Sequence, residues 1–276
     1  HTVDLPASGG TDQPLVVPGA LASGFNDAAG SPFWFNGKVP TLPFNAKLFG
    51  PSGPHTYDGT TGIDSGIPTG PGATKPLNVK FTRAGTYKFF CDVHYGMVGF
   101  VVVKAKHEKI PTARQDSAAL TAQVTAAAKS AKQIAGKKEP ADTVGLGRAG
   151  SGGLELFQMF PTTLTVPSGT AVTFTMSSRT REIHTATFGP KDYLKALAQT
   201  YRSPVPSPIG DFPSDPVQPI VLSPTSHGNG FGNVGVLSRD PKTPNPSSRQ
   251  IRFTQPGTYH FVCLIHPQMQ GTIIVK

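Results

Sequence analysis

A segment of 24 residues occurs twice in this chain, and the repeat constrains both the fold and the chemistry. Residues 81–104 read FTRAGTYKFFCDVHYGMVGFVVVK, and residues 253–276 read FTQPGTYHFVCLIHPQMQGTIIVK. The two copies are identical at 12 of 24 positions, at a constant offset of 172. The repeat predicts two related units, and a chain of 276 residues is long enough for two domains that each have a buried core.

Each copy of the repeat contains one of the two cysteines of the chain, followed at the same intervals by a histidine and a methionine. These six residues are Cys91, His94, Met97, Cys263, His266 and Met269. A thiolate, an imidazole and a thioether on one short loop are soft donors, which suit copper better than magnesium, calcium or manganese. The pattern therefore predicts a copper site in each unit.

Two other interpretations of the cysteines explain less of the pattern. A disulfide between Cys91 and Cys263 is a common use of a cysteine pair in a secreted protein. It accounts neither for the repeated His and Met nor for the equivalent positions of the two cysteines. Structural zinc takes four Cys or His ligands and rarely uses Met. Copper is therefore the metal that the pattern favours.

The composition favours short strands joined by turns and long loops. Charged residues make up 15% of the chain, and 31 Gly and 28 Pro interrupt its short apolar runs, so long helices should be scarce. Strands are expected at 99–104, 164–166, 171–176, 250–253, 257–262 and 272–275. Short strands between Gly and Pro turns predict an all-β protein with two Greek-key β-sandwich domains.

The composition also divides the chain into two domains and a linker. The first domain is expected to span residues 1–105 and the second residues 154–276, with a helical and Gly-rich linker at residues 106–153. Residues 145–153 of this linker are expected to be flexible. A short helix is expected at residues 191–200, inside a long insert of the second domain.

The linker is expected to contain one amphipathic helix of roughly 23 residues, about 35 Å long at 1.5 Å per residue. A T-x-x-Q capping box at Thr112 and Gln115 marks its start. Apolar residues then recur every three or four positions, at Leu120, Val124, Ala127, Ala131 and Ile134. We expect this apolar stripe to pack on a domain.

Charge and hydropathy limit the partners of the chain. The formal net charge is +9, but eight of the 25 Lys and Arg lie between residues 104 and 138, and no basic stretch is interleaved with stacking aromatic residues. This pattern argues against nucleic acid and favours an acidic redox partner. No apolar run approaches the ~20 residues that cross a bilayer, and no charged-then-apolar leader is present. We therefore expect a soluble, extracytoplasmic chain without a transmembrane segment, from which any export signal has been removed.

The segment G-T-Y-x-F-x-C-x-x-H-x-x-M resembles the small blue copper proteins, the cupredoxin family of plastocyanin, azurin and amicyanin. Its Cys-x2-His-x2-Met loop is similar to the short form in amicyanin. The resemblance implies a second histidine well upstream, which completes a His2Cys ligand set with a weak axial Met. It also implies one type 1 copper per domain, with the loop histidines near the surface as electron ports.

The upstream histidine is clearest in the second domain. Residues 164–174 resemble the paired strands that lead to the first ligand of the family, and His184 follows them. In the first domain, His1-Thr-Val-Asp-Leu matches His184-Thr-Ala-Thr-Phe, which predicts His1 as the ligand. The first domain then lacks its N-terminal strands. His55, which lies 36 residues before Cys91, is the alternative ligand, and an N-terminal copper brace at His1 is a third possibility.

The resemblance implies an electron-transfer protein that relays single electrons between redox partners, and an oligomer is compatible with the sequence. Pro267 and Gln268 replace Tyr95 and Gly96 between the two loops, which suggests different potentials for the two coppers.

The main alternative is a copper-dependent oxidoreductase like the multicopper oxidases and copper nitrite reductases, or a subunit of one. These enzymes place a His beside the cysteine, whereas here Phe90, Asp92, Val262 and Leu264 flank the two cysteines and no H-x-H pair occurs. We therefore expect no intrinsic catalytic copper site. His227 is expected to be a loop residue. Copper storage would favour Met-rich or His-rich tracts, which the sequence does not contain.

Overall fold

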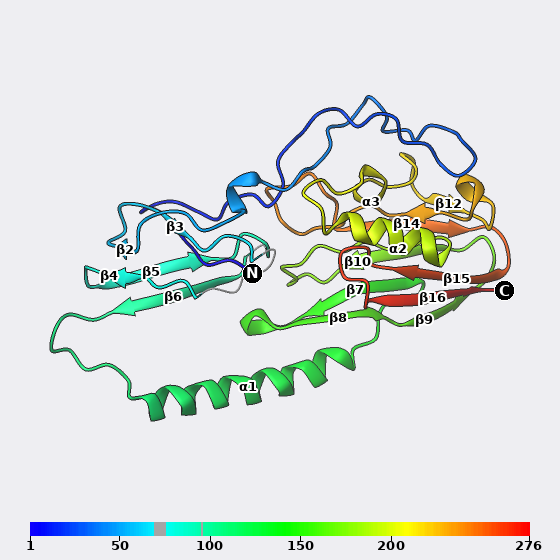
Figure 1. Cartoon of the computed structure of the whole chain (residues 1–276). Coiled ribbons are helices and arrows are strands. Elements are labelled where there is room, and N and C mark those ends of the chain that lie inside the picture. The colour runs from blue at the N-terminus through cyan, green and yellow to red at the C-terminus, as the bar shows by residue number, and fades with distance from the viewer. Residues whose placement is uncertain (69–75, 95) are drawn as a thin grey trace. The chain divides into compact units, whose positions relative to one another are not determined.

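The chain forms two compact units, each built mainly from β-strands (Figure 1). The structure is a computed structural model that describes residues 1–68, 76–94 and 96–276. Unit 1 contains His1–Val17 and Phe44–Ala126, and unit 2 contains Pro18–Pro43 and Ala127–Lys276. No helix in these residues combines the length and the apolar character needed to cross a membrane.

Unit 1 contains a four-stranded sheet in the order β3-β1-β5-β6. Its strands are β1 (Asp4–Leu5), β3 (Ile63–Asp64), β5 (Gly85–Phe90) and β6 (Val98–Val103). A short 3-10 helix, η1 (Ala46–Leu48), and a parallel pair, β2 (Thr56–Tyr57) and β4 (Lys80–Phe81), complete the unit. Among the described residues, its buried cluster includes Leu5, Tyr57 and Ile63, with partly buried residues such as Phe81 and Tyr87 packed against them.

Unit 2 contains two five-stranded sheets, which form the predicted β-sandwich. The first sheet has the order β12-β14-β10-β7-β8, and its strands are β7 (Thr143–Ala149), β8 (Glu155–Phe160), β10 (Ala171–Met176), β12 (Ile220–Leu222) and β14 (Ser248–Phe253). The second has the order β13-β11-β15-β16-β9, and its strands are β9 (Thr163–Val166), β11 (Thr187–Phe188), β13 (Gly232–Asn233), β15 (Gly257–Val262) and β16 (Gln270–Val275).

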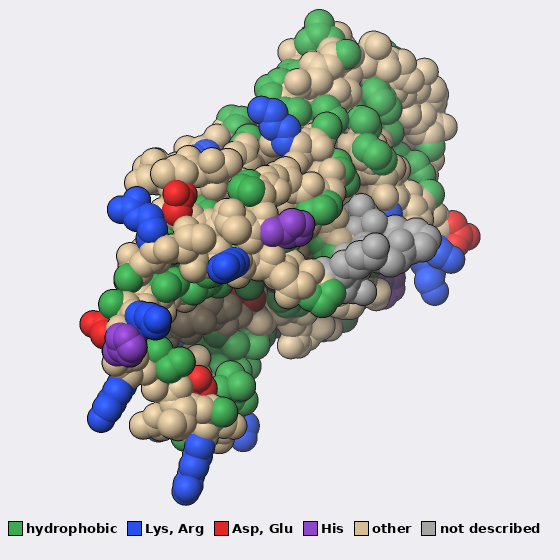
Figure 2. Space-filling view, turned by 60° about the vertical axis from the view of Figure 1, so that its left-hand side comes forward, with side chains coloured by type: hydrophobic (Ala, Val, Ile, Leu, Met, Phe, Trp, Pro, Cys, Tyr) green, Lys and Arg blue, Asp and Glu red, His purple; other side chains and the backbone are tan. Residues whose placement is uncertain are grey.

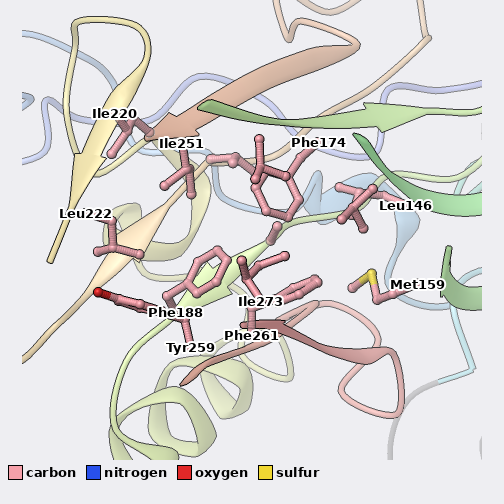
Figure 3. Packing of buried hydrophobic residues seen from close by; sticks show 14 of the residues in the cluster. Leu146, Met159, Phe174, Phe188, Ile220, Leu222, Ile251, Tyr259, Phe261 and Ile273 are labelled. Carbon is pink, nitrogen blue, oxygen red and sulfur yellow. The ribbon is translucent and has the colours of Figure 1, made fainter. Parts of the chain in front are cut away.

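The core of unit 2 lies between these two sheets. Alternate residues of β10 are buried, as expected for a strand with one face toward a core. Figure 3 shows Phe174 and Ile251 of the first sheet facing Phe188, Phe261 and Ile273 of the second. Short strands thus form a closed apolar interior, which confirms the all-β prediction.

The four strands of the unit 1 sheet have the same order and register as β13, β11, β15 and β16 of unit 2. Asp4 pairs with Asp64 and with Phe90, just as Thr187 pairs with Asn233 and with Val262. The described residues of unit 1 contain no five-stranded counterpart of the other sheet. Because Asp4 is equivalent to Thr187, His1, three residues before Asp4, occupies the position that His184 has before Thr187 in unit 2.

The prediction of a flexible stretch at residues 145–153 is wrong for its first half. Residues 143–149 form β7, every residue of which is buried, and β7 pairs with both β10 and β8. The register shifts between Leu146 and Arg148, where Gly147 has a φ of 72°. Glycine serves here to form a β-bulge in a buried strand, because it adopts positive φ without strain.

The linker helix α1 (Ala113–Ala135) and its capping box are confirmed. The Gln115 N–H donates to Thr112 Oγ1 at 3.3 Å, and the Thr112 N–H donates to Gln115 Oε1 at 2.9 Å. The packing predicted for its apolar stripe is wrong over most of the helix, because Leu120 and Val124 are 61% and 60% exposed. Only the last turn is anchored, through buried Ile134.

Arg148 of β7 anchors that last turn of α1. Its Nη1 donates to the carbonyl oxygens of Ile134 at 2.7 Å and Ala135 at 2.8 Å, and its Nη2 pairs with Glu139 at 2.8 Å. The last carbonyls of a helix have no partner within the helix, so the guanidinium supplies the missing donors.

Residues 18–43 form a strap that belongs to unit 2, although the sequence pattern predicted them within the first domain, residues 1–105. Phe33 and Phe35 of the strap are buried in a cluster with Phe231 and Leu264, and Trp34 Nε1 donates to the carbonyl of Pro213 at 2.8 Å. The other elements of unit 2 are α2 (Lys191–Thr200), α3 (Pro208–Asp211), η2 (Ser151–Gly153) and η3 (Ser226–Gly228). The first of these confirms the predicted helix at 191–200.

Candidate metal centres

The repeated loops have two backbone hydrogen bonds in common. In unit 2, the Cys263 N–H donates to the Met269 carbonyl at 2.9 Å, and the Met269 N–H donates to the His266 carbonyl at 2.8 Å. The corresponding distances in unit 1 are both 3.0 Å, from Cys91 to Met97 and from Met97 to His94. These hydrogen bonds hold the Cys, His and Met of each repeat on one tight turn between two strands.

In unit 2, the structure brings His184 to this turn. Cys263 Sγ lies 3.7 Å from His184 Nδ1 and 3.8 Å from His266 Nδ1, and the two Nδ1 atoms are 3.2 Å apart. His184 is fixed by two backbone hydrogen bonds with Leu237, one of which is its N–H donating to the Leu237 carbonyl at 3.2 Å. One sulfur and two ring nitrogens therefore converge on a single point.

Burial favours the neutral form of both kinds of donor in unit 2, which readies the imidazole for a cation but not the thiol. His184 is 1% exposed, and burial, followed by the charge of His266, lowers its pKa to about 3, so the ring is neutral and can offer a lone pair. Burial also raises the pKa of the Cys263 thiol, so without a cation the thiol keeps its proton more firmly. A bound cation would offset the desolvation of the thiolate, because a coordinated thiol is deprotonated.

Three residues around this centre were missed in the sequence. A Cβ on Gly147 would lie 2.9 Å from His184 Nε2, so only glycine lets β7 approach the ring this closely. The Phe157 ring lies 4.9 Å from the His266 ring, and Glu182 Oε2 lies 3.9 Å from His266 Nε2. The only signal was the glycine-rich stretch around Gly147, which we interpreted as flexible.

In unit 1, the structure brings together His1, Cys91 and His94. Cys91 Sγ lies 3.7 Å from His1 Nδ1 and 3.5 Å from His94 Nδ1, and the two rings are 4.4 Å apart. His55, the alternative, is exposed, and its Nδ1 lies 3.4 Å from the carbonyl of Asn78 instead. The geometry therefore favours His1 over His55.

The two centres share a further contact to sulfur. The Thr2 N–H points to Cys91 Sγ at 3.4 Å, and the Thr185 N–H points to Cys263 Sγ at the same distance. Both cysteines are free, so the disulfide alternative is wrong. Tyr95, which we expected to distinguish the two loops, lies outside the described residues.

The two methionines differ in exposure. Met269 is 1% exposed, whereas Met97 is 41% exposed. The donor set of each unit, one thiol and two imidazoles with a thioether on the same turn, fits copper by its chemistry.

Comparisons with known proteins agree with this donor set. Residues 61–104 match the family model of copper binding proteins, plastocyanin/azurin family. This range contains Cys91, His94 and Met97. This segment of the chain is therefore similar to the plastocyanin/azurin family. No curated protein sequence matches it.

Solved structures similar to this chain include a plastocyanin, an auracyanin and an amicyanin. The oxidised plastocyanin of Dryopteris crassirhizoma is 23% identical in sequence, with a TM-score of 0.28. The matched region covers 49% of this chain and 99% of the plastocyanin. The auracyanin of Roseiflexus castenholzii has 18% identity, with 50% and 99% covered and a TM-score of 0.29. The amicyanin of Paracoccus versutus has 15% identity, with 50% and 85% covered and a TM-score of 0.28.

Proposed function

We propose that this chain is an electron-transfer protein that binds one type 1 copper in each unit and relays single electrons between extracytoplasmic redox partners. The observation that carries the proposal is the duplicated donor set, in which two ring nitrogens and one sulfur converge in each unit. Copper, when bound there, supplies a one-electron couple between Cu(I) and Cu(II). The ligands would be His1, Cys91, His94 and Met97 in unit 1, and His184, Cys263, His266 and Met269 in unit 2.

The role of the protein is to hold these donors in one arrangement. In unit 2, the backbone bonds of His184 to Leu237, the close approach of Gly147 and the contact of Thr185 with sulfur all fix the donors before any metal arrives. A preformed site needs little rearrangement when its charge changes, so electrons can move at low structural cost.

The loop histidines provide a route for electrons to the surface. Cys263 and His184 are buried, whereas the His266 side chain is 17% exposed. His94 has a similar intermediate exposure in unit 1. An electron would therefore enter or leave unit 2 through His266, where a partner can dock against the ring.

The charge of the chain favours acidic partners. Lys and Arg exceed Asp and Glu by nine residues, from 25 against 16, and basic side chains are the more prominent on the face shown in Figure 2. Opposite charges steer redox proteins together and raise their association rate.

A copper-dependent oxidoreductase is the competing proposal, and the remaining histidines favour it less. A catalytic copper would need additional ligands, but His55 contacts a backbone carbonyl, and His227 lies between Asp27 and Asp215 at 3.3 Å from each. Neither belongs to a donor group in the described residues.

A reductive titration of the copper-loaded protein tests the proposal. We expect two electrons per chain and loss of a Cu(II)–thiolate absorption band, with one electron each for the Cys91→Ser and Cys263→Ser variants. His260→Asn is a matched control, because His260 is an exposed residue of β15 whose Nδ1 lies 3.1 Å from Thr272 Oγ1 and which belongs to neither donor set. Oxygen or nitrite consumption by the same sample would support the oxidoreductase instead.

A further inference from the structure

The two centres differ in the residues that lie behind the cysteine. The strand registers make Asp4 equivalent to Thr187 and Asp64 equivalent to Asn233. In the repeat, Asp92 is equivalent to Leu264. Three acidic residues of unit 1 thus replace two neutral polar residues and one apolar residue of unit 2.

The neutral set in unit 2 is hydrogen-bonded or packed. Thr187 Oγ1 donates to Asn233 Oδ1 at 2.8 Å, and Asn233 Nδ2 lies within 3.0 Å of the carbonyl oxygens of Ile209, Gly210 and Phe212. Leu264 is buried in the apolar cluster that includes Phe33 and Phe35. No charge is therefore added behind Cys263 by these residues.

The acidic set in unit 1 is buried. Asp4, Asp64 and Asp92 are 5%, 7% and 5% exposed. Asp92 accepts from Thr2 Oγ1 at 3.0 Å and from the Gln13 N–H at 2.7 Å, and Asp64 accepts from the Gly66 N–H at 2.7 Å. Asp4 Oδ2 is buried without a hydrogen-bond partner in the described structure.

The three carboxyl groups influence one another. Burial raises the pKa of Asp4 to about 7, and the charges of Asp92 and Asp64 add to the shift. Burial also raises the pKa of Asp64 to about 6. Such shifts are expected where like charges share a site of low polarity, and both groups gain their charge as the pH rises through these values.

Asp92 joins this acidic cluster directly to the centre. The Asp92 N–H donates to Thr2 Oγ1 at 2.8 Å, and the Thr2 N–H points to Cys91 Sγ at 3.4 Å. Asp92 also follows Cys91 directly in the sequence, so its carboxylate belongs to the residue next to the sulfur ligand.

Charge and burial both favour a lower reduction potential for the centre of unit 1 than for the centre of unit 2. With one thiolate and two neutral imidazoles, the oxidised centre carries one net positive charge and the reduced centre carries none. Nearby carboxylates stabilise the positive form, whereas a buried apolar site favours the neutral form. Unit 1 has three buried carboxyl groups behind its cysteine and an exposed Met97. Unit 2 has a buried Met269 and neutral residues at the three equivalent positions, and its acidic neighbour is Glu182, which lies 3.9 Å from His266 Nε2 on the side of the loop histidine.

We infer that the centre of unit 1 has the lower reduction potential, set by Asp4, Asp64 and Asp92, so that an electron shared by the two centres resides on unit 2. This inference rests on the proposed function. In the transfer, the centre of unit 1 loses one electron and is oxidised, the centre of unit 2 gains that electron and is reduced, and no bond forms or breaks. The chain then has a direction: it accepts electrons at unit 1 and delivers them from unit 2.

Single-centre variants test this inference. Cys263→Ser leaves only the centre of unit 1, and Cys91→Ser leaves only that of unit 2, so the midpoint potential of each can be measured by spectroelectrochemistry at about pH 8. We expect at least a tenfold preference of the electron for unit 2, which for a one-electron couple is about 59 mV. Equal potentials, or a lower potential for unit 2, would overturn the inference while leaving two working copper sites.

Charge removal then tests the cause. In the Cys263→Ser background, we expect Asp4→Asn, Asp64→Asn and Asp92→Asn each to raise the midpoint potential. Asp4→Asn is the decisive variant, because Asp4 Oδ2 has no hydrogen-bond partner in the described structure and the charges that act on Asp4 are those of Asp92 and Asp64, whereas the carboxylates of Asp64 and Asp92 hold backbone N–H groups. Asp58→Asn is the matched control, since Asp58 is not buried and bonds Thr60.

The outcomes separate the two proposals. An unchanged potential in Asp4→Asn, with an intact Cu(II)–thiolate band, would overturn the role of the acidic cluster. A shift as large in Asp58→Asn would do the same. The absence of that band in both single-centre variants would overturn the proposed function itself.

Discussion

Replacing Gly147 by alanine tests how the protein positions His184. The added Cβ would lie 2.9 Å from His184 Nε2 and 3.3 Å from the carbonyl oxygen of Leu156. Favourable contacts between heavy atoms lie at about 3.5–4.0 Å, so the ring or the strand must move. Since His184 is fixed by backbone hydrogen bonds to Leu237, we expect the imidazole to leave its position beside Cys263.

A second glycine separates the effect of this contact from that of backbone strain. Gly152 has a φ of 73°, nearly the same as the 72° of Gly147, and a Cβ there would meet nothing within 4 Å. Both alanine variants therefore carry about 1–2 kcal/mol of left-handed strain. Only Gly147→Ala also disturbs a ligand, and loss of a residue that orients a ligand typically costs about 10–100-fold in metal affinity.

The assay is a competition for Cu(I) between the protein and a chromophoric chelator, in the Cys91→Ser background so that only unit 2 is measured. We expect the copper affinity of Gly147→Ala to fall about 10–100-fold below that of Gly152→Ala. Urea unfolding of both variants gives the strain common to the two. Equal affinities in the two variants would refute the role of Gly147 in positioning His184.

Two further predictions concern the segments that hold unit 2 together. The bond to Asp215, followed by its charge and by Asp27, raises the pKa of His227, so its stabilisation of the strap is complete below the ordinary pKa of 6.5 and is lost as the pH rises through the raised value. Urea unfolding against pH should show this alkaline loss in the parent and not in His227→Phe; an identical loss in both would contradict it. Arg148→Met leaves the carbonyls of Ile134 and Ala135 without their donor, so we expect unit 2 to lose about 1–3 kcal/mol and the last turn of α1 to exchange its amide protons faster. Unchanged exchange there would contradict the anchoring role of Arg148.

The parts of the fold that could be predicted have strong local signals. The internal repeat placed two equivalent loops, alternation of apolar residues placed the strands of unit 2, and the capping box at Thr112 placed the start of α1. The match between His1 and His184 came from a five-residue phrase, and the strand registers around Asp4 and Thr187 agree with it.

The parts that were missed depend on contacts between distant segments. Gly147 lies in a buried strand, but a glycine in a sequence indicates flexibility and a β-bulge equally well. The apolar residues of α1 have helical spacing, yet no periodicity states whether a surface is available to cover Leu120 and Val124. The strap at residues 18–43 has no helical or strand periodicity in its apolar residues. Its aromatic side chains are buried against distant residues of unit 2, such as Phe231 and Leu264, which the local sequence does not indicate.

The number of copper ions bound per chain, measured by metal analysis after removal of loosely bound metal, shows whether each repeated loop forms a copper centre of its own. We expect two ions in the parent and one each in Cys91→Ser and Cys263→Ser. One ion in the parent, with no loss in one of the two variants, would contradict the claim that each repeated loop forms its own copper centre.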